Sequence, residues 1–130
     1  MTAFYREVLG LAVQRELELE GEYISQLLGF PNAHLRIVFL GTEGEQHDLE
    51  LLQYVNPPDG DGHGPKNRLG TAHLCFNVDD LEGMHRELSG RGVRFVNAPA
   101  VRDFPGRGTI KTCYAQDPEG NWLEFMERAG

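Results

Sequence analysis

The sequence lacks the features of disulfide-rich, zinc-ribbon and membrane proteins. Its 130 residues include two cysteines, Cys75 and Cys113, and neither belongs to a Cys-x-x-Cys pattern. These cysteines support neither a zinc ribbon nor a thioredoxin-like redox pair, and we expect both thiols to be reduced. No apolar run approaches the roughly 18 residues that a membrane helix needs.

Basic residues are also scarce. Twelve Lys and Arg residues stand against twenty Asp and Glu residues, which gives a formal net charge of −8. This balance argues against a nucleic-acid partner and against binding to an anionic membrane surface. The first residues have neither the basic start nor the apolar stretch of a signal peptide. We therefore expect a cytoplasmic protein.

Glycine and proline are plentiful, with 16 and 7 residues, which favours short strands and turns over a helical bundle. In the first half, apolar periodicity predicts a helix over 4–11 and strands over 12–19, 22–28, 35–40 and 48–54. In the second half it predicts a helix over 81–91, capped near Asp79 and Asp80. Strands there are predicted over 71–78, 93–96, 110–115 and 122–126, with a loop over 97–108 and a turn over 117–121.

The two halves share one order of elements. Residues 4–10, Phe-Tyr-Arg-Glu-Val-Leu-Gly, align with 84–90, Met-His-Arg-Glu-Leu-Ser-Gly. Residues 49–53, Leu-Glu-Leu-Leu-Gln, align in the same way with 123–127, Leu-Glu-Phe-Met-Glu. Each half therefore predicts a helix followed by three strands, and the second half has a further strand before its helix. We divide the single domain into module one (1–55), a linker loop (56–69) and module two (70–130).

Three residues fall at equivalent places in this duplicated plan. Glu50 and Glu124 lie in the last strand of each half, and His73 lies in the first strand of the second half. A carboxylate between apolar strand residues needs a partner if it is buried, and carboxylates and an imidazole satisfy one another through a divalent cation. We predict that Glu50, His73 and Glu124 are metal ligands. Taken singly, each Glu also fits a solvated strand face, and His73 fits a hydrogen-bonded core histidine.

The chain resembles the vicinal oxygen chelate superfamily, also called the glyoxalase, bleomycin-resistance and extradiol-dioxygenase superfamily. Residues 4–11, 49–53, 70–81 and 114–125 carry the resemblance. It implies an α+β fold of two tandem βαβββ modules, whose mixed sheets form an open cup around a metal held by the first and last strands of each module. In that family a strand before the first helix supplies a fourth ligand, usually His. The repeat places its equivalent upstream of Met1, so we expect module one to lack its first strand.

The resemblance also implies a function, a divalent-metal-dependent lyase or isomerase of the glyoxalase type. The metal would be Ni, Zn, Co, Mn or Fe, and it would stabilise an enediolate while Glu124 acts as the base, by analogy with glyoxalase I. The expected partner is a small-molecule substrate with adjacent oxygens, and the sheet edge left open in module one predicts a homodimer. Two alternatives stay open, an extradiol-type dioxygenase and a metal-free drug-binding or resistance protein.

The remaining histidines are weaker candidates for this site. His34 and His47 lie at strand edges near turns, and His63 lies in a glycine-rich loop. His85 is out of phase with the apolar positions of its helix, so we expect it to be exposed.

Overall fold

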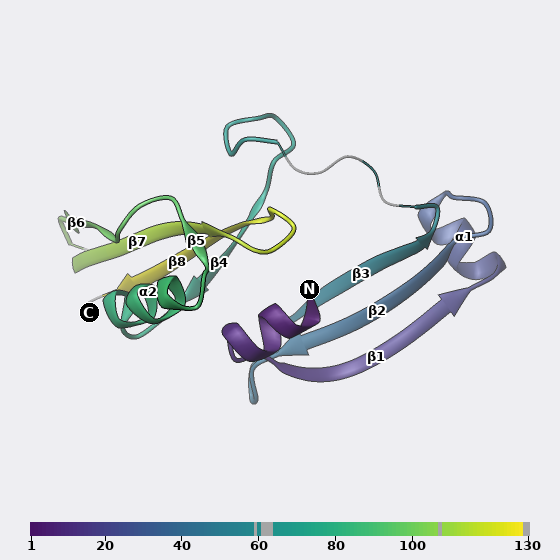
Figure 1. Cartoon of the computed structure of the whole chain (residues 1–130), viewed down its shortest axis with the longest axis horizontal. Helices are drawn as coiled ribbons and strands as arrows, with labels where there is room; N and C mark the ends of the chain where they lie inside the picture. The colour runs from purple at the N-terminus through teal and green to yellow at the C-terminus, as the bar shows by residue number, and fades with distance from the viewer. Residues whose placement is uncertain (59, 61–63, 107, 129–130) are drawn as a thin grey trace. The chain divides into compact units, whose positions relative to one another are not determined.

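The computed structural model describes residues 1–58, 60, 64–106 and 108–128 (Figure 1). The chain forms two compact units, Met1–Asp61 and Gly62–Gly130. Each unit is an open sheet accompanied by helices, so the predicted α+β fold class is confirmed. No helix in the described residues is long and apolar enough to cross a membrane.

The first unit is built on a three-stranded antiparallel sheet in the order β1-β2-β3. A short π-helix, η1 (Phe4–Val8), precedes β1, and helix α1 connects β1 to β2 (Figure 1). The described residues contain no strand before η1. The bounds are β1 (Ala12–Glu20), α1 (Glu22–Leu28), β2 (His34–Gly41) and β3 (Asp48–Asn56).

Helix α1 occupies the segment for which the sequence predicted a strand over 22–28, so that prediction was wrong. Ile24 is buried and Leu28 packs against the same core cluster, which is the i, i+4 spacing of one helix face. Tyr23 lies on another face and is 71% exposed. The helix ends at Gly29, whose φ of 73° is a left-handed conformation that glycine adopts readily. Seven residues form barely two helical turns, and in so short a segment a helical pattern of apolar residues cannot be told from the alternating pattern of a strand.

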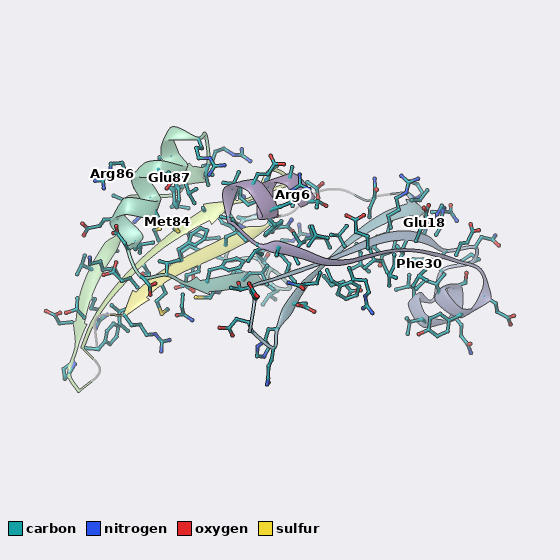
Figure 2. The ribbon with its side chains drawn as sticks, turned by 90° about the horizontal axis from the view of Figure 1, so that it is seen from below. Arg6, Glu18, Phe30, Met84, Arg86 and Glu87 are labelled. Carbon is teal, nitrogen blue, oxygen red and sulfur yellow. The ribbon has the colours of Figure 1, made fainter. Side chains whose placement is uncertain are left out.

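The second unit is a five-stranded mixed sheet in the order β4-β8-β7-β5, with β6 also paired to β7. Strand β4 runs parallel to β8, and every other described pair is antiparallel. Helix α2, which carries Met84, Arg86 and Glu87, covers one face of this sheet (Figures 1 and 2). The bounds are β4 (His73–Asn77), α2 (Leu81–Gly90), β5 (Arg94–Phe95), β6 (Ala100–Phe104), β7 (Gly108–Gln116) and β8 (Trp122–Arg128).

Strand β6 lies within the segment predicted as a loop over 97–108, which is a second correction. All five of its residues are exposed, so it shows no alternation between buried and exposed positions. Its extended conformation comes from the ladder with β7, which runs from Ala100 opposite Thr112 to Phe104 opposite Gly108. Pairing of this kind is formed by the backbone and leaves little signal in the side chains.

Two carboxylates fix the start of α2. Asp80 Oδ1 accepts a hydrogen bond from the Gly83 amide at 2.9 Å, which confirms the predicted N-cap. Glu127 Oε2 on β8 accepts from the Leu81 amide at 2.8 Å, and its other oxygen lies 3.1 Å from Lys111 Nζ. The hydrogen bond from Leu81, followed by Lys111, lowers the pKa of Glu127 below its ordinary value.

We expect Glu127→Gln to lower the free energy of unfolding by more at pH 7 than at pH 3. The pKa of Glu127 is lower in the folded than in the unfolded chain, so its stabilisation is present above the unfolded value and is lost as the pH falls through the folded value. Urea unfolding of both proteins at the two pH values measures this. Glu119→Gln, in an exposed turn, is the control, and an equal loss of stability at both pH values would contradict the prediction.

Candidate functional site

Glu124 and His73 lie on the sheet face of the second unit that α2 does not cover. Leu123 and Phe125 are 0% and 2% exposed and belong to the core. Glu124 lies between them, and successive side chains of a strand point to opposite faces, so Glu124 points away from that core. His73 is opposite Trp122 in the parallel ladder, two residues from Glu124, and therefore shares its face.

His73 and Glu124 are in direct contact. His73 Nε2 lies 3.1 Å from Glu124 Oε2, with side-chain exposures of 44% and 15%. The Tyr114 hydroxyl is 3.5 Å from the same His73 nitrogen, and the two rings meet edge to face with centroids 5.3 Å apart. The structure thus brings together two of the three predicted ligands and adds a tyrosine that the sequence analysis did not name.

Two neutral donors flank the Glu124 carboxylate. Cys75 on β4 and Tyr114 on β7 are its direct partners in the two ladders, so both side chains share its face of the sheet. Burial, and then the negative charge of Glu124, raises the pKa of the Tyr114 hydroxyl and of the Cys75 thiol above their ordinary values. Both groups are therefore protonated at neutral pH.

Glu50 lies in the first unit, on β3, where its side chain is exposed. It is the third residue of its strand, as Glu124 is of β8, so the two halves place these carboxylates at equivalent positions. Its ladder partner is Phe39, which in turn pairs with Arg15. The Arg15 guanidinium carbon lies 4.2 Å from the centroid of the Phe39 ring.

The contact between His73 and Glu124 fits two ligands of one metal ion. Metal bonds of about 2.0–2.2 Å in tetrahedral geometry separate ligand atoms by roughly 3–4 Å. The described residues contain no cluster of three or more His, Cys, Asp or Glu side chains that could hold a metal. The second unit by itself therefore supplies two suitable ligands, an imidazole nitrogen and a carboxylate oxygen.

A pocket of about 300 Å³ opens beside this pair, within the second unit. His73 and Tyr114 form part of its wall, and Trp122 at the start of β8 forms another part. The Trp122 indole N–H donates to the Gly64 carbonyl at 3.3 Å, which ties the ring to the segment before β4. The remaining lining residues are Lys66, Asn67, Thr71 and Ala72.

A buried aspartate shapes the turn that leads into β8. Asp117 is 1% exposed, and among the residues that the structure describes it is the one buried charged side chain. Its Oδ1 accepts from the amides of Glu119 and Asn121 at 3.0 and 2.9 Å, and its Oδ2 accepts from the Asn121 side chain at 2.7 Å. The turn predicted over 117–121 is confirmed, and it positions the strand that carries Glu124.

The other histidines lie outside this cluster or outside the described residues. His34 Nε2 is 2.7 Å from Glu18 Oε1 across the β1-β2 ladder, and His47 is exposed in the turn before β3. His85 is half-buried against Phe95, with ring centroids 4.5 Å apart, so its predicted exposure was wrong. His63 lies outside the part of the chain that the structure describes.

Known proteins share this arrangement of strands. The model of the Glyoxalase/Bleomycin resistance protein/Dioxygenase superfamily matches residues 1–125. The chain belongs to this superfamily. The resemblance inferred from the sequence motifs is therefore confirmed, and it extends over nearly the whole chain.

Solved structures of glyoxalase proteins are similar in fold to this superfamily member. A glyoxalase family protein from Bacillus cereus is 25% identical with a TM-score of 0.81, over 95% of this chain and 82% of that one. One from Enterococcus faecalis is 25% identical with a TM-score of 0.61, over 97% and 85% of the two chains. The trypanothione-dependent glyoxalase I of Leishmania major is 18% identical with a TM-score of 0.59, over 96% and 74%. At 18% identity, this last similarity shows the fold alone.

Proposed function

We propose that this glyoxalase superfamily member is a divalent-metal-dependent lyase or isomerase that transfers a proton next to a carbonyl group. The contact of 3.1 Å between His73 Nε2 and Glu124 Oε2 carries the proposal. These two residues would hold the metal, with Glu50 as the third ligand. When bound, the metal supplies a Lewis acid for two adjacent substrate oxygens and stabilises the negative charge that develops on them.

The resemblance to metal-binding members of the superfamily supports these assignments. In those members the ligands come from the first and last strands of each module. His73 opens β4, the first strand of the second unit, and Glu124 lies on β8, its last strand. Glu50 lies on β3, the last strand of the first unit.

In the proposed reaction Glu124 is the base. Its carboxylate takes the proton from the carbon next to the carbonyl, the C–H bonding electrons stay with the substrate, and the proton returns to the neighbouring carbon in an isomerisation. The Tyr114 hydroxyl lies 3.5 Å from His73 Nε2, and Tyr114 is opposite Glu124 in the β7-β8 ladder, so it positions both groups. Proton transfer by a positioned side chain contributes about 10²–10⁴-fold to a rate.

Metal binding tests the proposal directly. We expect the wild-type protein, dialysed against Ni²⁺, Co²⁺ or Zn²⁺, to retain one ion per chain. His73→Ala should weaken metal binding by at least about 100-fold, because loss of a group that only orients a ligand already costs about 10–100-fold. Elemental analysis and competition with a chelating dye measure both.

His47→Ala is the matched control, since His47 is exposed in a turn of the other unit, and its metal affinity should equal that of the wild type. A wild-type protein that retains no ion, with His73→Ala unchanged, would contradict the metal site. The alternative function, a metal-free drug-binding protein with this fold, would then be favoured.

The homodimer also stays a prediction. Strand β3 pairs with β2 on one edge, and the described residues provide no strand for its other edge. An open edge presents backbone donors and acceptors that a second chain can satisfy. This edge is the place where we expect two chains to meet.

A further inference from the structure

Lys66 is a cation without an acidic partner in the described residues. The chain has two lysines, and the other, Lys111, is held by Glu127 at 3.1 Å and by Glu82 at 3.3 Å. No ion pair within the described residues involves Lys66, although the chain carries a net charge of −8. An ammonium group that no described carboxylate neutralises is, in so acidic a protein, a local centre of attraction for a small anion.

Aromatic rings fix this ammonium at the wall of the pocket. Lys66 Nζ lies 4.8 Å from the centroid of the Tyr114 ring and 5.2 Å from the centroid of Trp122. Cation–π contacts at these distances hold the ammonium in place without neutralising its charge. Tyr114 also contacts His73 edge to face, so the same ring contacts both the Lys66 ammonium and the proposed metal ligand.

We propose that Lys66 binds the carboxylate of the substrate and that the substrate is therefore a small organic acid. This inference rests on the proposed function, because it places the acid in the pocket that His73 lines. The carboxylate accepts hydrogen bonds from the ammonium, and the carbon skeleton lies against the rings of Tyr114 and Trp122. A volume of about 300 Å³ is at the small end of ligand pockets, which fits an acid of a few carbons.

The fluorescence of Trp122 reports binding, because it is the single tryptophan of the chain and lines the pocket. The probe is 2-hydroxyisocaproate, which has a hydroxyl next to its carboxylate, an apolar branch and no aromatic ring. We expect it to change the fluorescence saturably, and its neutral amide to bind at least about tenfold more weakly, because the amide lacks the charge that Lys66 recognises. Titrations use both EDTA-treated and metal-loaded protein.

Variants of the two lysines test whether Lys66 is the residue that binds the acid. Lys66→Gln should weaken binding of the acid by about tenfold or more and leave binding of the amide unchanged, since only the acid uses the charge. Lys66→Arg should restore most of the affinity for the acid. Lys111→Gln is the matched control and should bind the acid as the wild type does. Thermal melting of each variant shows that it is folded.

The proposal would be overturned by equal affinities for acid and amide, by an unchanged affinity in Lys66→Gln, or by the absence of a saturable response with either form of the protein. Full displacement of the acid by an equal concentration of inorganic phosphate would also reject the carboxylate assignment, because it indicates a site for any anion. Failure of the proposed function gives a different result from failure of the Lys66 proposal. The wild type would then retain no metal, but it would still bind the acid through Lys66 in the presence of EDTA.

Discussion

Glu124→Gln is expected to lower turnover by about 10²–10⁴-fold while most of the bound metal remains. The amide keeps the shape of the side chain and one oxygen that can face His73, which lies 3.1 Å from the carboxylate. It cannot take a proton, so the step that breaks the C–H bond loses its base. Exchange of the hydrogen next to the carbonyl of an α-hydroxycarbonyl substrate for deuterium, followed by proton NMR at saturating metal, measures this step.

Two further carboxylate variants separate the roles of ligand and base. Glu50→Gln should weaken metal binding but have a smaller effect on proton exchange once the metal is saturating. Glu119→Gln, in the exposed turn before β8, should change neither quantity. If metal-loaded Glu124→Gln exchanges the hydrogen at a near-normal rate, Glu124 is not the base and is a ligand at most.

Asp117→Ala is expected to lower the free energy of unfolding of the second unit by about 3 kcal/mol or more. The substitution removes a buried carboxylate that accepts three hydrogen bonds from Glu119 and Asn121. Two of the donors are backbone amides, and leaving them without a partner costs the desolvation of each group. Urea unfolding followed by Trp122 fluorescence measures this, because the only tryptophan lies in the second unit.

Smaller changes in the same turn should have smaller effects. Asp117→Asn keeps one acceptor oxygen for the backbone amides but sets an amide donor against the Asn121 side chain, so we expect a loss of about 1–2 kcal/mol. Glu119→Ala removes an exposed side chain and should change stability by no more than about 0.5 kcal/mol. A loss in Asp117→Ala no larger than that of Glu119→Ala would contradict the structural role of Asp117.

Internal repetition made most of the fold predictable. The segments around Glu50 and Glu124 align in sequence, and the structure places both at the third residue of a strand. Alternation revealed these strands because one of their faces packs against a core. Strand β6 and helix α1 escaped prediction because neither has that signal, the first being exposed throughout and the second having seven residues.

The candidate site was predictable where it follows the repeat and not elsewhere. The contact between His73 and Glu124 agrees with the positions that the duplicated plan gave them. Tyr114 has a signal in the sequence, because a turn over 117–121 joining two strands sets Tyr114 opposite Glu124 in an antiparallel ladder. Lys66 had none, since it lies in a segment without periodicity and its position depends on two rings distant in sequence.

Because β4 pairs with β8, the last strand, completing the site during folding requires a long loop to close. Glu124 and Tyr114 belong to one hairpin, ten residues apart, whereas His73 is 51 residues from Glu124. Closing the longer loop costs about 1.4 kcal/mol more in chain entropy than closing the shorter one. A chain with only the hairpin formed has its carboxylate and phenol in place but no imidazole beside them. A ligand that bridges His73 and Glu124 therefore stabilises the contact whose formation costs more chain entropy.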